Sequence, residues 1–130
     1  MLKWLCLICS DQWKCVTTMP TKRHYSGVAA LDTKIYITGG DDDNYHTLSS
    51  VDCYDPDTNT WSQVANMNCA RKEHILVSVH GRLYAIGGRD ADSVEVYDPD
   101  NNTWSLLQHK LDGIVAATGA GLIKKLMLDA

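Results

Sequence analysis

The sequence predicts an all-β protein that contains two copies of one four-stranded antiparallel unit, and two internal alignments support this prediction. An offset of 48 residues superposes 13–40 on 61–88, with seven identical pairs among 28. An offset of 43 residues superposes 51–61 on 94–104, with eight identical pairs among 11. Self-similarity at such a period is typical of repeat proteins in which each unit is one small sheet.

The two offsets differ because one connection differs in length. Ten residues separate Gly40 from Val51, whereas five separate Gly88 from Val94. The matched blocks on both sides of this insertion are intact, and surface loops are the segments that tolerate such changes. We therefore expect an exposed loop after each Gly pair, and a longer loop in the first unit.

Each unit contains four short segments with the patterns of β-strands. The first two are nearly continuous apolar runs, which are typical of strands covered on both faces. The third alternates, so that Val51 and Cys53 point to one face of the sheet while Asp52 points to the other. The predicted strands are 26–31, 34–38 and 51–54 in the first unit and 74–79, 82–86 and 94–97 in the second, with fourth strands that begin at Trp61 and Trp104.

A tight turn is predicted between the third and fourth strands of each unit. The block Tyr-Asp-Pro-Asp-x-Asn-Thr-Trp begins at Tyr54 and again at Tyr97. Proline presets the backbone at the second position of a turn, and the Asp side chains can accept hydrogen bonds from the turn's own N–H groups.

These recurring residues carry a resemblance to a known family. An arginine, a Gly-Gly pair, a tyrosine and a tryptophan follow one another in the same order in each unit, which resembles the kelch repeat. The resemblance covers about 90 of the 130 residues. The signature residues are Arg23 and Arg71, Gly39-Gly40 and Gly87-Gly88, Tyr54 and Tyr97, and Trp61 and Trp104.

The resemblance implies a partial β-propeller of about two kelch blades with poorly defined ends, because kelch units form blades that pack face to face around a channel. The form of the repeat is most similar to the kelch-like proteins, whose propellers follow BTB and BACK domains and recruit substrates to a cullin-type ubiquitin ligase. Other kelch propellers bind actin. The resemblance therefore implies a cytoplasmic protein-interaction scaffold, with a cytoskeletal module that binds actin as the alternative.

Loop residues that differ between the two units are candidates for binding a protein partner. In related propellers, the loops before the first strand and after the Gly pair lie around the central mouth. Arg23 and Arg71 recur in the same frame, so a structural role is favoured over a ligand role. The candidates are His24, Tyr25, Asp41, Asp42, Asp43, Asn44, Tyr45, His46, Lys72, Glu73, Arg89 and Asp90.

The two ends of the chain depart from the repeat. Cys6 occupies the place of Tyr54 in the 48-residue register, so the segment before Trp13 lacks the third-strand signature. Two blades leave apolar faces uncovered, so we expect that further blades or domains are needed and that the chain is a fragment, an isoform or a partial gene model. The expected organisation is an atypical segment 1–12, the end of a preceding blade and a link over 13–24, repeat 1 over 25–64, repeat 2 over 65–107, and a divergent tail or third-blade start over 108–130.

Composition and motifs exclude several other functions. A net charge of -4 and a pI near 5.6 argue against nucleic-acid and anionic-membrane partners. The apolar start is far short of a membrane span and shows no signal cleavage site. Asp41 to Asn44 lacks the pattern of a calcium loop, and the sequon at Asn101 lies in a repeat turn.

The five cysteines are irregularly spaced, so we expect reduced thiols that are buried as small hydrophobic side chains, with no metal site. Neither a cofactor motif nor a catalytic triad is visible. A propeller enzyme and a truncated product without function are therefore the less favoured hypotheses.

Overall fold

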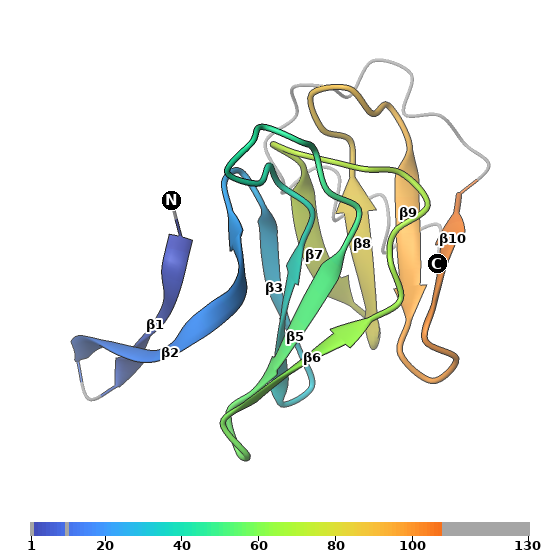
Figure 1. The fold of residues 1–130 in the computed structure, drawn as a ribbon. Helices are drawn as coiled ribbons and strands as arrows, with labels where there is room; N and C mark the ends of the chain where they lie inside the picture. Colours follow the sequence, from blue (N-terminus) through green and yellow to red (C-terminus); the bar gives the residue numbers. More distant parts are fainter. Residues whose placement is uncertain (1, 10, 108–130) are drawn as a thin grey trace.

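The computed structural model describes residues 2–9 and 11–107, and all of its elements are β-strands. The strands form a two-stranded sheet β1-β2 and two four-stranded sheets, β3-β4-β5-β6 and β7-β8-β9-β10, which we call blade 1 and blade 2 (Figure 1). Every pairing is antiparallel between strands that are neighbours in sequence. The described part of the chain has no helix that is long and apolar enough to cross a membrane.

The two blades have nearly identical strand boundaries, and these agree with the predicted ones to within a residue or two. Blade 1 consists of β3 (Gly27–Leu31), β4 (Lys34–Thr38), β5 (Val51–Asp55) and β6 (Thr60–Val64). Blade 2 consists of β7 (Ile75–Val79), β8 (Arg82–Ile86), β9 (Val94–Asp98) and β10 (Thr103–Leu106). The partial propeller with two four-stranded blades is therefore the observed fold.

The predicted turn chemistry is present between the third and fourth strands of both blades. Asp55 accepts a hydrogen bond from the backbone N–H of Asp57 at 3.0 Å, and Asp98 accepts one from Asp100 at 3.0 Å. These side chains replace backbone partners that the turn does not supply. The turns therefore form from local sequence alone.

The main core lies between the two blades, where their sheets pack face to face. Tyr36 of β4 and Tyr97 of β9 meet across this interface with ring centroids 5.7 Å apart. The strand β3 lies against β7, which places the first strands of both blades side by side (Figure 1). The core residues are Leu31, Tyr36, Val51, Cys53, Met67, Leu76, Leu83, Ala85, Tyr97 and Trp104.

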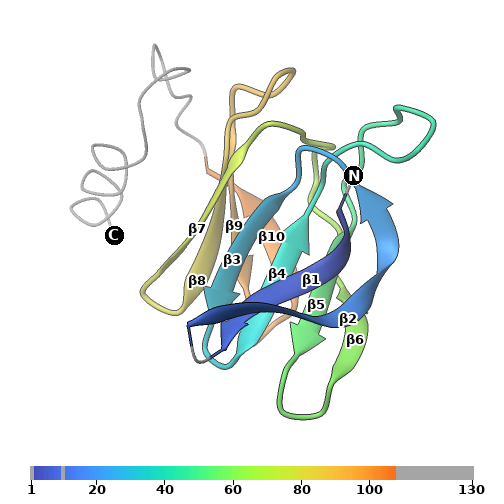
Figure 2. The same ribbon diagram turned by 90° about the vertical axis from the view of Figure 1, so that its left-hand side faces the viewer.

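The N-terminal segments form a hairpin of β1 (Leu2–Cys9) and β2 (Gln12–Arg23) on the side of blade 1 opposite blade 2 (Figures 1 and 2). Within it, Cys6 is opposite Cys15, whereas Trp13 is opposite Ile8. In blade 1 the corresponding tyrosine and tryptophan, Tyr54 and Trp61, are opposite each other. The predicted equivalence of Cys6 and Tyr54 is therefore wrong, because the β1–β2 turn is shorter than a blade turn.

The cysteine prediction is also partly wrong. Cys6 and Cys15 form a disulfide, and Cys15 is exposed rather than buried. Cys53 is buried as expected and Cys69 is half-buried, both as free thiols. The side chain of Cys9, and the tail 108–130 with its possible third-blade strand, lie outside the described residues.

Candidate functional site

The connections that enter and leave the blades gather at one end of the molecule, which we call the loop end. They are the β2–β3 link, the β4–β5 loop, the β6–β7 link and the β8–β9 loop, at the upper side of Figure 1. The tight hairpin turns of both blades lie at the opposite end. The arrangement places loop residues from distant parts of the sequence on one surface.

The second glycine of each Gly pair allows the backbone of two connections to approach closely. A Cβ atom at Gly40 would collide with the carbonyl oxygen of His24, and one at Gly88 would lie 2.9 Å from the carbonyl oxygen of Lys72. Both glycines also have positive φ, 86° and 125°, which other residues rarely adopt. The Gly pairs therefore serve backbone geometry.

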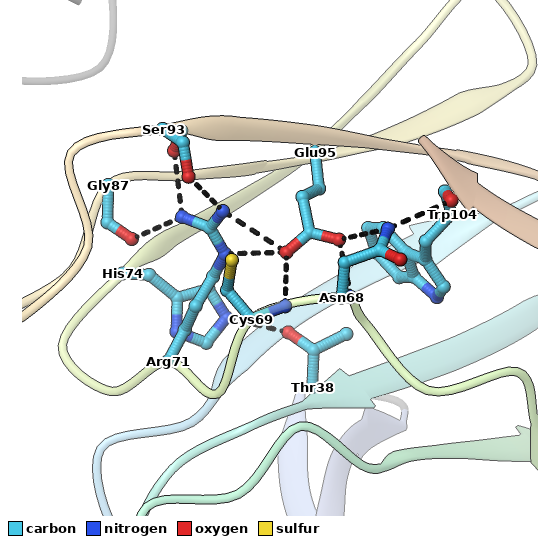
Figure 3. A network of polar contacts seen from close by, with 9 residues as sticks. All are labelled: Thr38, Asn68, Cys69, Arg71, His74, Gly87, Ser93, Glu95 and Trp104. Atoms are coloured by element: carbon cyan, nitrogen blue, oxygen red, sulfur yellow. Dashed lines mark hydrogen bonds and ion pairs between the residues drawn. The ribbon is translucent and has the colours of Figure 1, made fainter. Parts of the chain in front are cut away.

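Arg23 and Arg71 lie beneath the loop end and are completely buried. Arg71 donates from Nη1 to the carbonyl oxygens of Gly87 and Ser93 at 2.9 and 2.7 Å, and so ties together the two ends of the β8–β9 loop (Figure 3). Arg23 makes the corresponding bonds to Gly39 and Ser50 at 2.8 and 3.0 Å. Each arginine closes the base of a loop and offers no charge to a ligand.

The carboxylates that pair with these arginines are Asp52 and Glu95, whose role the sequence analysis did not identify. Asp52 Oδ2 accepts from Arg23 Nε and Nη2 at 3.2 and 2.9 Å, and Glu95 Oε1 accepts from the same atoms of Arg71 at 3.2 and 3.1 Å. Both carboxylates are fully buried. Asp52 lies on the face of β5 opposite Val51 and Cys53, and Glu95 lies on the face of β9 opposite Val94 and Val96. A carboxylate at the same position of both units, together with the recurring arginine, is the feature of the sequence that could have indicated this pairing.

The tip of the β4–β5 loop is held by hydrogen bonds around Asp42. Its Oδ1 atom accepts from the backbone N–H groups of Asn44 and His46 at 2.8 and 2.9 Å. The hydrogen bond from the His46 backbone is the main reason that the pKa of Asp42 is lowered, so this carboxyl is ionised at neutral pH. The tip presents Tyr45 to solvent with 82% of its surface exposed.

The other candidates border this tip. Tyr25 is 63% exposed, and its carbonyl oxygen accepts from the N–H of Glu73 at 2.9 Å. Asp90 is exposed in the β8–β9 loop. The ion pairs at the loop end are Lys22–Asp43 at 3.1 Å, Lys72–Asp41 at 2.8 Å and Arg89–Glu73 at 3.7 Å.

The candidates divide into two groups by exposure. Tyr25, Tyr45 and Glu73 are exposed and can contact a partner, whereas Asp41 is only 4% exposed and its carboxylate is bonded within the chain. In residues 2–9 and 11–107, no three His, Cys, Asp or Glu side chains are grouped as a metal ion would require. The side chains that this surface presents to solvent are aromatic and polar.

His74 lies below the loop end, between the blades. Its Nε2 atom is 2.7 Å from Thr38 Oγ1 of blade 1, and its Nδ1 atom is buried without a hydrogen-bond partner. Burial first, and then the nearby charge of Arg71, lower its pKa from 6.5 to about 4. His74 is therefore neutral at neutral pH and belongs to the blade interface.

Comparisons with known proteins agree with this architecture. A family model described as "Kelch motif" matches residues 22–68 and 70–109. Kelch-like protein 31 of Danio rerio is 40% identical over 86 residues, which are 62% of this chain and 14% of that protein. Human Kelch-like protein 28 is 36% identical over 91 residues, 65% of this chain and 16% of that protein.

Two further similarities are to another kelch relative and to the fold of a solved structure. Alpha-scruin of Limulus polyphemus is 36% identical over 86 residues, 62% of this chain and 9% of that protein. The solved structure of YjhT superposes with a TM-score of 0.67 at 18% identity, covering 79% of this chain and 43% of that one. The matched region is therefore only 9 to 16% of these three kelch relatives and 43% of the YjhT chain.

Proposed function

Because this chain belongs to the kelch-motif family, we propose that it is a protein-interaction module that binds its partner at the loop end of the blades. The observation that carries the proposal is the exposure of two tyrosines near the buried Arg23. Tyr45 lies on the β4–β5 loop, whose base Arg23 closes, and Tyr25 follows Arg23 by two residues. Aromatic side chains presented on a rigid base are frequent hot spots of protein interfaces, since little conformational entropy is lost on binding.

The difference between the two blades supports the same surface. The strands and the signature residues repeat, whereas the exposed loop residues change from Tyr25 to Glu73 at one equivalent position. Both residues have left-handed backbone angles, with φ of 56° and 55°, so the backbone is the same and only the side chain differs. A scaffold that repeats while its exposed tips vary is the arrangement expected of a recognition surface.

For the cellular role, we propose that the whole protein recruits a substrate to a cullin-type ubiquitin ligase in the cytoplasm. The similarity to the kelch-like proteins supports this role, which would require blades and domains outside the matched region. The similarity to alpha-scruin favours a second candidate, a cytoskeletal module that binds actin. Neither role requires catalysis by this chain.

Partner capture by loop-end variants tests the binding surface. We expect Tyr25→Ala and Tyr45→Ala each to weaken capture of partner proteins by about tenfold, because each removes an exposed aromatic anchor. Asp57→Ala, in the exposed turn at the opposite end, is the matched control and should bind as the unmodified chain does. Quantitative mass spectrometry of captured proteins would measure this, after thermal melting has shown that the variants remain folded.

Partner capture and actin cosedimentation together separate the two cellular roles. Enrichment of cullin-ligase subunits and their substrates would support the adaptor role, whereas cosedimentation of the purified chain with actin filaments would support the cytoskeletal one. Equal capture by the Tyr25, Tyr45 and Asp57 variants would refute the loop end as the binding surface.

A further inference from the structure

Asp41 joins three separate connections at the loop end. Its backbone N–H donates to the carbonyl oxygen of His24 at 2.8 Å, and its own carbonyl accepts from the N–H of His24 at 2.9 Å. Its Oδ1 atom accepts from Thr47 Oγ1 at 2.9 Å, and its Oδ2 atom accepts from Lys72 Nζ at 2.8 Å. Asp41 therefore holds together three segments, which are the β2–β3 link, the far end of the β4–β5 loop and the β6–β7 link.

The ion pair between Asp41 and Lys72 is much less exposed than the other pairs of this surface. Their side chains are 5% and 17% exposed, compared with 42% and 47% for Asp43 and Lys22. The hydrogen bond from Lys72 is the largest cause of the lowered pKa of Asp41, so this carboxyl is ionised at neutral pH. Exposed pairs contribute little to structure, whereas loss of one partner from a buried pair leaves a poorly solvated charge.

The loop tip is a unit that depends on this base for its position. The bonds from Asn44 and His46 to Asp42, and the bond from the Tyr45 N–H to the Asp42 carbonyl at 3.0 Å, all lie within the tip. Below it, the Leu48 N–H donates to the Gly40 carbonyl at 2.7 Å. The tip can therefore keep its internal shape while its placement is decided at Asp41.

We propose that Asp41 and Lys72 are positioning residues whose ion pair sets where Tyr45 stands relative to Tyr25. The inference rests on the proposed function, since it concerns the placement of two side chains that we assign to partner binding. In blade 2 the position of Asp41 is occupied by Arg89, on a loop shorter by five residues. The positioning pair therefore belongs to the longer loop, the one that needs to be held.

Amide hydrogen exchange of the 130-residue chain, followed by NMR, tests the proposal without a partner. In Asp41→Asn and in Lys72→Met, the amides of Asp41 and Leu48 at the loop base should exchange about tenfold faster, because this base opens locally. The amides of the tip and of β8 should change by less than about twofold. Lys72→Arg should restore slow exchange, and Lys22→Met, which breaks only the exposed pair, should leave the base unchanged.

The double variant Asp41→Asn with Lys72→Met should exchange no faster than the faster single variant, because both substitutions remove the same interaction. Unchanged exchange at the loop base in both single variants would overturn the proposal, and so would an equal increase in β8, which indicates general destabilisation. If Asp41→Asn does not fold, the comparison of Lys72→Met with Lys72→Arg decides. Failure here would leave the proposed binding surface intact, because partner capture tests that surface separately.

Discussion

Blade 1 and blade 2 bury the same arginine at the same place, but the carboxylate that meets it is longer by one methylene group in blade 2. Glu95 accepts not only from Arg71 but also from the backbone N–H groups of Asn68 and Cys69, at 2.6 and 2.9 Å, and from the Asn68 side chain at 2.9 Å (Figure 3). Asp52 binds Arg23 through Oδ2, and its Oδ1 atom is buried without a partner.

The reason lies in the segment that precedes each arginine. Asn68 corresponds to Pro20 in the 48-residue register, and proline has no N–H to donate. In blade 2 the buried charge pair therefore also fastens the β6–β7 link, which connects the blades. In blade 1 it fastens only the base of its own loop. The equivalent ion pairs of the two blades thus stabilise different amounts of the surrounding structure.

The largest expected difference between the blades follows from neutralising these carboxylates. Both oxygens of Glu95 accept from N–H donors, so the amide nitrogen of Glu95→Gln must face a donor while Arg71 loses its counter-charge. We expect the free energy of unfolding to fall by about 3–5 kcal/mol. Asp52→Asn can place its amide nitrogen at the unpartnered Oδ1 position. The free energy of unfolding should therefore fall by about 1–3 kcal/mol less in Asp52→Asn than in Glu95→Gln.

Urea unfolding followed by tryptophan fluorescence would measure both values, with an m-value to check that the same transition is compared. Equal losses for the two variants would contradict the unequal roles of the two carboxylates. A larger loss for Asp52→Asn would reverse the comparison.

The pH dependence of stability should also distinguish the two blades, because blade 2 has the titratable His74 where blade 1 has Ser26. The folded-state pKa of His74 is lowered from 6.5 to about 4 by burial first and then by Arg71, while Glu95 opposes the shift. The unfolded chain therefore binds a proton between these pH values that the folded chain does not. The neutral His74 should contribute on the order of 3 kcal/mol to the free energy of unfolding. This contribution should be fully present above pH about 6.5 and should be lost as the pH falls toward about 4.

Unfolding free energies measured from pH 4 to 7 for the unmodified chain and for His74→Gln would test this pH dependence. In the variant, the slope of the unfolding free energy against pH should decrease by the contribution of about one proton, because glutamine can bond Thr38 but does not titrate. A pH dependence that is identical in both proteins would show that other groups control acid unfolding.

The sequence predicted the parts of this fold that depend on local pattern. The strand boundaries of both blades follow from runs of apolar residues and from glycine, and the Asp55 and Asp98 turns follow from residues two positions apart. The recurrence of the Gly pairs in both units indicates a role in backbone geometry, and the close approach at Gly40 gives the physical reason.

Contacts between distant segments could not be predicted in the same way. Arg23 and Asp52 are 29 residues apart, and the alternation along β5 could not reveal that its second face is also buried. The disulfide between Cys6 and Cys15 depends on the register of β1 and β2, which the repeat predicted incorrectly. The burial of Asp41 depends on Lys72, which arrives from the β6–β7 link.

The smallest expected difference concerns the asparagines of the two turns. Asn59 accepts one hydrogen bond, from Tyr54 Oη at 2.9 Å, and does so within blade 1. Asn102 accepts from Tyr97 Oη at 2.9 Å and also from the backbone N–H of Ala65 at 2.9 Å, which joins blade 2 to the link that follows blade 1. Both asparagines have left-handed backbone angles, φ 52° and 50°, so replacement by alanine adds the same strain to each.

We therefore expect Asn102→Ala to lower the free energy of unfolding by about 1 kcal/mol more than Asn59→Ala, the value of one hydrogen bond. Because the backbone strain is matched, the difference between the variants isolates the bond to Ala65. Thermal melting of the two variants in parallel would measure it, and glycine at each position would check the strain by relieving it. If Asn59→Ala proved as costly as Asn102→Ala, the bond to Ala65 would contribute nothing to holding the blades together. Their association would then rest on the other contacts between them, such as the packing of Tyr97 against Tyr36 and the hydrogen bonds of Glu95 to the β6–β7 link.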